Sequence, residues 1–342
     1  MNRETMAAMS RSRWALCAAA LLSVSCGGGG GGGTQPPAGG GGGGGGSNPL
    51  SGVIWHGNYA LDLVSGSQLA YLSGELPRLV HGDTAAAPAA DGSRYGITDY
   101  DSSNDETRLS IKRTSDGGVL FTRVYEGYLS AQQPSPTVVS QMLVQYQDDP
   151  SAPRFHGVVD LATGNVLEVF PADTVAATWL SDGRVVVLAG SGALSVGQPG
   201  AARTTTGQID LLGRFVVRLR AQPGNTRLLL VLQARSSGGD VEGSDLWLSN
   251  LDGSNRVRYT RTNISGGGIW SPDGTRITFA IDTGTVCGGS SCIGTCEQWH
   301  APASASELNP VPASPGVAGR FLVKNRQGQT QTLGCGLSGW TP

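Results

Sequence analysis

Residues 266–282 read GGGIWSPDGTRITFAID, and this stretch decides the fold. Pro272 presets the backbone of a tight turn, the Asp273 side chain can bond the turn backbone, and Gly274 accepts a positive φ. The residues after the turn alternate between apolar and polar, as they do in a β-strand with one buried face. The stretch therefore predicts a β-hairpin.

Related hairpins recur along the chain with a period of about 45 residues. Each copy has a Gly-containing turn, an Arg and then an apolar strand, except that one copy has Gln141 at the Arg position. The turn residues of the other copies are Asp91, Gly92 and Arg94, then Asp182, Gly183 and Arg184, then Asn225 and Arg227, and finally Asp273, Gly274 and Arg276. We expect each Arg stem to cover its hairpin, with a ring of Arg binding an anion as the alternative.

A second type of hairpin alternates with the first. Its copies begin at Tyr59, Arg108, Phe155, Ala193, Leu246 and Arg320. Two hairpins per period are four strands, which is one blade of a β-propeller. Residues 50–342 are therefore expected to form an all-β, six-bladed propeller. Because residues 339–342 (GWTP) match residues 269–272 (IWSP), one blade is expected to be closed by both chain termini, with residues 52–55 as the next strand.

Residues 245–260 (DLWLSNLDGSNRVRYT) and 266–282 together resemble the WD40-like (PD40) repeat of TolB-type β-propellers. The resemblance implies a propeller fold for the repeats. We expect a departure from TolB, with a lipid-anchor signal in place of an amino-terminal α/β domain. TolB's own partners are therefore not implied for this chain.

The amino terminus indicates an exported, lipid-anchored protein. Residues 1–25 have Arg residues followed by a short apolar run and small residues, which is typical of a secretory signal peptide. The segment ending at Cys26 resembles a bacterial lipobox and predicts lipid on that Cys, with an ordinary signal peptide as the alternative. Residues 26–49 are a Gly-rich linker that cannot bury apolar surface. We expect the protein in the bacterial cell envelope, on the outer membrane, facing the periplasm or the cell surface.

The composition excludes several classes of protein. The chain contains 53 Gly among 342 residues, is 15% charged and has a net charge of −2. The charged residues that cover helix surfaces are scarce, so a long coiled coil is excluded. Nothing attracts a phosphate backbone, so no nucleic-acid partner is expected.

Four cysteines lie within residues 50–342. Cys287, Cys292 and Cys296 fall in a segment, residues 283–318, that is expected to be an insertion lengthening the last blade, and Cys335 follows it. An even number of Cys in an oxidising compartment predicts two disulfides, in any of three connectivities. The alternative is a zinc site in which His300 joins the first three cysteines.

An acidic segment could bind calcium. Alternating carboxylates on a loop are ligands that Ca²⁺ prefers, but the full calcium-loop pattern is missing and a solvated acidic turn is the simpler explanation. Its polar residues are Asp99, Asp101, Asn104, Asp105 and Glu106. No cofactor is expected apart from this calcium.

The sequence contains no nucleophile elbow, phosphate-binding loop or cofactor fingerprint. We therefore expect a non-catalytic propeller that binds a protein, peptide or glycan partner in the envelope and is tethered to the membrane through Cys26. The alternative is a metal-dependent propeller enzyme, lactonase-like or dehydrogenase-like, with its site in the central channel. A ring of Asp, Glu, Asn or His facing the channel would indicate the enzyme, and a channel lined by small and apolar residues would indicate the binding protein.

Overall fold

The computed structural model describes residues 50–56, 59–65, 68–71, 86–147, 155–239, 241–288, 291–310, 316–324 and 335–342. The chain divides into two units, residues 1–49 and 50–342, and all described residues belong to the second. The expected signal peptide, Cys26 and the Gly-rich linker lie outside the described residues. No helix in the described part of the chain could span a membrane.

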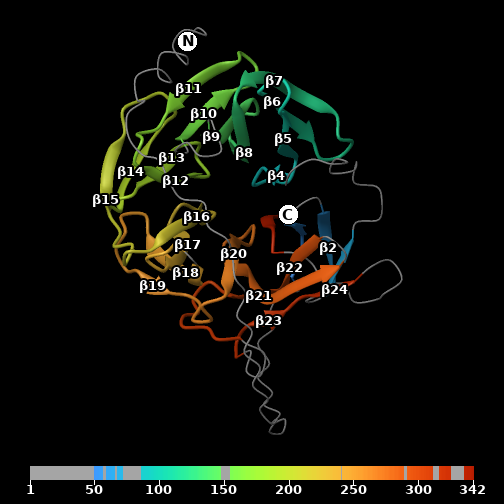
Figure 1. The fold of residues 1–342 in the computed structure, drawn as a ribbon, viewed down its shortest axis with the longest axis vertical. Coiled ribbons are helices and arrows are strands. Elements are labelled where there is room, and N and C mark those ends of the chain that lie inside the picture. Colours follow the sequence, from blue (N-terminus) through green and yellow to red (C-terminus); the bar gives the residue numbers. More distant parts are fainter. Residues whose placement is uncertain are drawn as a thin grey trace, which may run out of the picture. The chain divides into compact units, whose positions relative to one another are not determined.

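Six sheets surround a central axis, five of them antiparallel and one with an added parallel strand, so the predicted six-bladed β-propeller is confirmed (Figure 1). Blades 1 to 6 are named in chain order of their second strands. The innermost strands of blades 1 to 6 are β25 (Leu337–Thr341), β4 (Ala87–Pro88), β8 (Tyr128–Pro134), β12 (Thr174–Trp179), β16 (Phe215–Ala221) and β20 (Ser265–Trp270).

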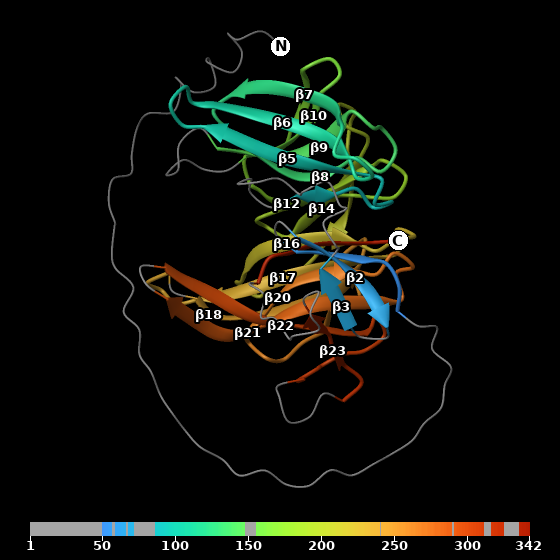
Figure 2. The same ribbon diagram turned by 90° about the vertical axis from the view of Figure 1, so that its right-hand side faces the viewer.

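The second strands, in the same order, are β1 (Val53–His56), β5 (Arg94–Asp101), β9 (Gln141–Gln147), β13 (Val185–Ala189), β17 (Arg227–Arg235) and β21 (Arg276–Gly288). The third strands are β2 (Tyr59–Ser65), β6 (Glu106–Arg113), β10 (Phe155–Asp160), β14 (Ala193–Gly197), β18 (Val241–Asn250) and β22 (Ser291–Pro302). The fourth strands are β3 (Gln68–Tyr71), β7 (Val119–Glu126), β11 (Asn165–Val169), β15 (Thr204–Gln208), β19 (Val257–Arg258) and β23 (Gly319–Arg320). Figure 2 shows β5, β6 and β7 of blade 2 side by side.

The core lies between neighbouring blades, because each sheet buries both faces of its middle strands. Leu228 and Leu230 on β17 pack with Val186 and Leu188 on β13, which joins blades 4 and 5. The intervening Leu229 packs with Phe279 on β21, which joins blades 5 and 6. Alternate residues of one strand therefore serve two interfaces, and each interface buries a continuous apolar layer.

Both chain termini build blade 1, as predicted. β25 pairs with β1 in antiparallel register, with Ile54 opposite Trp340 and Val53 opposite Thr341. The Trp55 indole N–H donates a 2.9 Å hydrogen bond to Thr341 Oγ1, which links the two ends across 286 residues of sequence. The pairing removes the free sheet edge that an open ring would expose.

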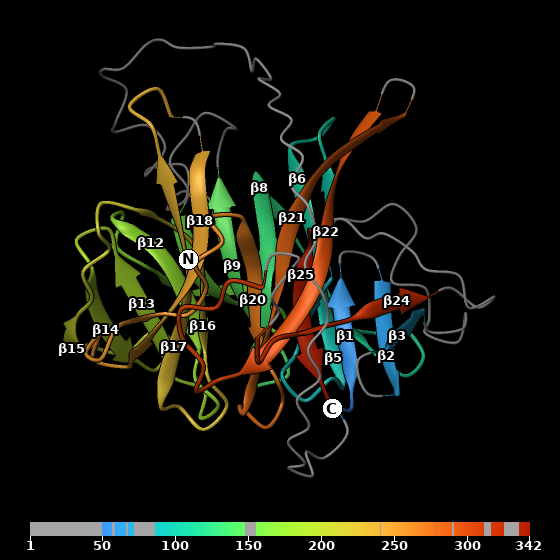
Figure 3. The same ribbon diagram turned by 90° about the horizontal axis from the view of Figure 1, so that it is seen from below.

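The predicted position of the outer hairpin in the last blade is wrong. The hairpin expected to begin at Arg320 lies only partly within the described residues, and its described strand does not belong to the last blade. Arg320 ends β23, and the next strand, β24 (Leu322–Lys324), pairs in parallel with β3 of blade 1. The third strand of blade 6 is instead β22, which lies within the segment expected to be an insertion. Its hairpin with β21, like the hairpin of β17 and β18, extends well beyond the shorter strands of the ring (Figure 3).

Candidate functional site at the mouth of the channel

A cavity of about 150 Å³ opens where the six innermost strands end. We call this side of the ring the turn face, because the connections from the innermost to the second strands lie there. All six blades line the cavity, with residues such as Pro88, Gln132, Ser181, Arg220, Trp270 and Ser338. The cavity is therefore the mouth of the central channel on the turn face.

Three tryptophans support the cavity wall. The indole N–H of Trp179 donates to the Gln133 carbonyl of blade 3 at 3.0 Å, and that of Trp270 donates to the Arg220 carbonyl of blade 5 at 3.3 Å. Trp340 donates to the Ser51 carbonyl at 3.0 Å. Each indole thus combines apolar burial with a hydrogen bond that holds a neighbouring segment in place. The wall presents prolines, amides and hydroxyls to the opening.

The described innermost strands carry no Asp, Glu or His. Their charged residues are Arg218 and Arg220, both on β16. Metal-dependent and general acid–base chemistry need carboxylates or imidazoles as ligands or proton carriers. These six strands offer neither group, and their wall carries positive charge.

The two guanidinium groups lie close together. The Arg218 guanidinium donates to the carbonyls of Leu337 on β25 and Gly267 on β20, whereas that of Arg220 donates to the Leu219 carbonyl at 3.3 Å. Burial lowers the pKa of Arg218. Burial, together with the positive charge of Arg218, lowers the pKa of Arg220 to about 9. With a pKa of about 9, the Arg220 guanidinium stays charged at neutral pH, and neither arginine has a carboxylate partner within the described residues.

The repeat turns place their Asp residues around this mouth. Asp91 accepts from the backbone N–H of Ser93 at 3.1 Å, and Asp273 accepts from that of Thr275 at 3.0 Å. Gly92, Gly183, Gly274 and Asn225 have positive φ in these turns. Asp182 accepts hydrogen bonds from both the backbone and the guanidinium of Arg184, which hold the pKa of that carboxyl below its usual range. These carboxylates stabilise their own turns.

The repeated arginines of the second strands do not form one ring of donors. The Arg94 guanidinium donates to the Ser135 carbonyl of blade 3, and that of Arg227 donates to the Ala303 carbonyl at 2.9 Å. The Arg276 guanidinium lies 2.7 Å from His300 Nδ1. Burial and the Arg276 charge lower the pKa of His300 to about 4, so this imidazole is neutral at pH 7. These arginines connect hairpins and blades, and they do not meet at the axis.

The acidic segment is the turn between β5 and β6. Asp101 accepts from the Ser103 backbone N–H at 2.9 Å and from the Asn104 amide at 2.7 Å, which lowers the pKa of Asp101. Asp105 accepts from the Tyr100 hydroxyl at 2.8 Å. Glu106 begins β6, and Asp99 lies 3.8 Å from the Arg108 guanidinium. The turn explains these contacts, and calcium binding there stays a prediction.

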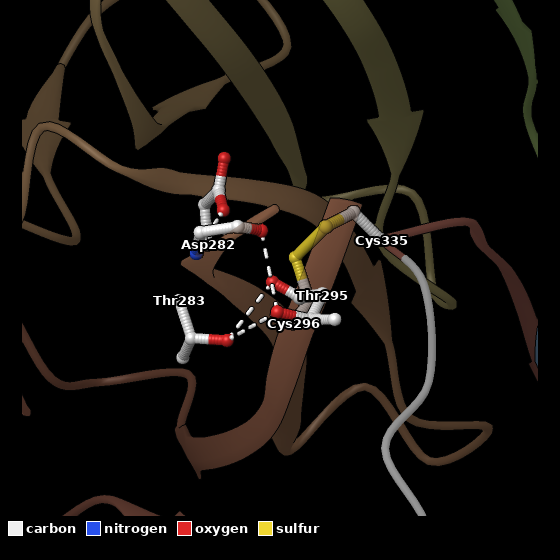
Figure 4. Close-up of a disulfide and its surroundings, with 6 residues drawn as sticks. Asp282, Thr283, Thr295, Cys296 and Cys335 are labelled. Atoms are coloured by element: carbon white, nitrogen blue, oxygen red, sulfur yellow. Dashed lines mark hydrogen bonds between the residues drawn. A yellow bond between two sulfur atoms is a disulfide. The ribbon is translucent and has the colours of Figure 1, made fainter. Parts of the chain in front are cut away.

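One disulfide joins Cys296 on β22 to Cys335, which lies two residues before β25 (Figure 4). Beside it, the Thr283 hydroxyl donates to the Thr295 carbonyl at 3.0 Å. A bonded Cys296 offers no thiolate, so the alternative zinc site with His300 is not formed. The strand register places Cys287 opposite Cys292, which is the one pairing left for a second disulfide.

Sequence reasoning missed Arg218 and Arg220. The signal was present, because residues 215–221 read FVVRLRA and place two arginines at alternating positions just before a repeat turn. Alternation puts both side chains on one face of a strand. The sequence does not show that this face meets the channel, because that depends on how the six blades are arranged in the ring.

No family model matches the chain, and no curated protein matches its sequence. Solved structures that it resembles include the tricorn protease, at 9% identity and a TM-score of 0.41, covering 82% of this chain and 28% of that one. Another is the Niastella koreensis GH74 enzyme, at 10% identity and a TM-score of 0.44, covering 80% of this chain and 45% of that one.

A third similar structure is the β-propeller domain of Myceliophteria thermophila Cps50 (Swd1). It is 10% identical with a TM-score of 0.44, and the match covers 79% of this chain and 89% of that one. The chain thus spans under a third of the length of the tricorn protease chain. These likenesses concern the fold.

Proposed function

We propose that this protein is a membrane-tethered, non-catalytic β-propeller that binds a protein, peptide or glycan partner in the bacterial cell envelope. The observation that carries the proposal is the wall of the channel, whose six described innermost strands have no carboxylate and no imidazole. The partner binds at the turn-face mouth, where prolines, amides and hydroxyls surround a cavity of about 150 Å³. Such a surface suits recognition rather than bond breaking.

The proposal also includes a lipid anchor at Cys26 and membership of the TolB-type propeller family. The lipobox-like segment before Cys26 supports a lipid anchor at the outer membrane, and the Gly-rich residues 27–46 would separate this anchor from the propeller. The PD40-like residues 245–260 and 266–282 support a TolB-type propeller. Mass spectrometry of the membrane fraction should find acylated Cys26 as the mature amino terminus. A soluble protein that begins at another residue would refute the tether.

Site-specific photocrosslinking in intact cells tests the binding mode. A benzophenone side chain at Gln132 or Ser181, which line the cavity, should capture one discrete partner. The control position is Thr205 on β15, an exposed residue of an outermost strand. Equal capture from all three positions, or none from the mouth, contradicts the proposal. So does metal-dependent turnover of a lactone by the pure protein that is lost when a carboxylate is replaced.

A further inference from the structure

Arg218 and Arg220 place two guanidinium groups on one face of β16, beside the cavity. They alternate along β16 with Leu219 and Ala221, which pack into the apolar layer between blades 4 and 5. The two arginines therefore face away from that layer. Arg220 lines the cavity, and Arg218 lies one step deeper, where its guanidinium bridges the carbonyls of β20 and β25.

The charge of this pair is not balanced within the described residues. Two other poorly exposed arginines have a carboxylate partner, since Arg203 pairs with Glu168 at 2.7 Å and Arg258 pairs with the buried Asp245. Around Arg218 and Arg220 the described residues supply carbonyl oxygens and no carboxylate. Buried charge without a counter-charge is costly, and the mutual repulsion of the pair adds to the cost. An anion in the cavity would relieve both.

Unused hydrogen-bond donors face the same place. Apart from its bond to the Leu219 carbonyl, the Arg220 guanidinium has no partner among the described residues, and Arg220 is half-buried at the cavity wall. The Ser338 hydroxyl, in the β25 wall of the cavity, is buried without a hydrogen-bond partner in the described part of the chain. A guanidinium fork with free N–H groups matches the two oxygens of a carboxylate.

The surroundings favour a single carboxylate over a polyanion. The cavity is small, and Asp182 and Asp273 directly follow the cavity-lining residues Ser181 and Pro272. A nucleic acid or another polyanion would meet these carboxylates at the rim, which repel it. A peptide can place one negative group at Arg220 and neutral residues against the prolines and amides of the mouth.

We propose that Arg220, supported by the positive charge of Arg218, binds a carboxylate group of a peptide partner inside the turn-face mouth of the channel. This inference rests on the proposed binding function and names the chemistry that the partner must present. The carboxylate comes from an acidic side chain or from a carboxyl terminus.

Small probes test the site on the full chain purified in detergent. N-acetylglutamate α-amide represents an acidic side chain, N-acetylalanine a carboxyl terminus, and N-acetylglutamine amide is the neutral control. Binding is followed by NMR at the indole N–H of Trp270, which donates to the Arg220 carbonyl. We expect a saturable shift with at least one carboxylate probe and none with the neutral control. The probe that binds more tightly identifies the source of the carboxylate.

Variants assign the binding to Arg220. Arg220→Gln should weaken the carboxylate probe at least tenfold, and Arg220→Lys, which keeps the charge but loses the fork, should weaken it less. Arg123→Gln, at an exposed arginine of the outermost strand β7, should leave the affinity unchanged. Melting curves of all variants show whether Arg220→Gln still folds. If Arg220→Gln does not fold, the weaker binding expected for Arg220→Lys is the test.

Three results overturn the inference. The first is no saturable shift with either carboxylate up to about 50 mM, a concentration that detects even millimolar binding. The others are an equal shift with the neutral control, or tighter binding of inorganic phosphate than of both carboxylates. The proposed function fails separately. If the probes bind but no partner is crosslinked, the site stands without the function. If wild type and Arg220→Gln capture the partner equally, the function stands without the site.

Discussion

At the scale of single residues, Gly339 shows how closely the closing strand approaches its neighbour. A Cβ atom at Gly339 would lie 2.2 Å from Pro88 Cγ of blade 2. Gly266, on the innermost strand of blade 6, has nothing within 4 Å of the same position and has no positive φ. The two glycines therefore form a matched pair.

Gly339→Ala should lower the free energy of unfolding by about 1–3 kcal/mol, because β25 or β4 must shift to admit the methyl group. Gly266→Ala should change it by less than about 0.5 kcal/mol, as surface substitutions do. Urea unfolding of both variants measures the difference. Equal losses of unfolding free energy in the two variants would show that β25 and β4 admit the extra methyl group without destabilising the fold.

His300 should make the stability of the propeller depend on pH. Its pKa is about 4 in the folded chain because of burial and the Arg276 charge, against an ordinary value of 6.5. The unfolded chain takes up a proton first as the pH falls, so stability is complete above about pH 6.5 and is lost between pH 6.5 and 4. Between pH 7 and 5 this loss is about 2 kcal/mol.

Urea unfolding at pH 7 and pH 5 checks this expectation against His300→Gln, which has no titrating imidazole. The variant should lose less stability than the wild type over this interval. An identical pH dependence in the two proteins would show that His300 is protonated normally in the folded chain.

At the scale of the elements, the C-terminal segment contributes three strands to two different blades. It ends blade 6 as β23, adds β24 to the outer edge of blade 1, and provides the innermost strand of blade 1 as β25. The disulfide from Cys335 to Cys296 holds the start of this last strand against β22 of blade 6. Blade 1 therefore depends on the disulfide as well as on strand pairing.

The disulfide should stabilise the closure. Its Cys residues are 39 positions apart, and a loop of this length predicts a loss of about 4 kcal/mol when Cys296 and Cys335 are both replaced by Ser. A disulfide between Cys287 and Cys292 would close a loop of only a few residues, so replacing both should cost about 2 kcal/mol. Unfolding in guanidinium without reductant measures both losses.

Thiol counting is the control for this comparison. The unfolded, unreduced wild-type propeller should show no free thiol among its four cysteines, and Cys296→Ser alone should release one. Two free thiols in the wild type would mean that Cys287 and Cys292 are not bonded. Equal losses from the two double variants would mean that the longer loop does not stabilise the ring.

At the scale of the whole molecule, the ring is stable only when it is closed. Deletion of residues 337–342 removes β25 and exposes the edge of β1 together with the apolar residues that pack around Trp340. We expect a fall in Tm of at least 10 °C and a tendency to associate through the exposed edge, because several buried side chains are lost at once. Differential scanning calorimetry and light scattering give the two readouts.

A shorter deletion provides the control. Pro342 follows β25 and is exposed, so its removal alone should leave the Tm unchanged. An unchanged Tm after deletion of all six residues would contradict closure by β25.

The sequence alone determined the number of blades and the closure by both termini. Tight turns such as Ser271 to Arg276 and the alternation of apolar residues are local properties, encoded by residues next to one another in the chain. The matching of GWTP to IWSP extended the same local pattern to the carboxyl terminus. The repeat is interrupted after β21. The local pattern therefore predicted the wrong position for the outer hairpin of blade 6.

Only the tertiary structure decided what meets at the axis and at the ring junction. The pairing of Cys296 with Cys335, the parallel addition of β24 and the contacts of Arg218 with Gly267 and Leu337 all join residues far apart in sequence. A strand pattern says which side chains share a face, but not what that face opposes. Among the described residues, Arg218 and Arg220 have no carboxylate partner, because β20, β25 and β16 itself offer their guanidinium groups only backbone carbonyls.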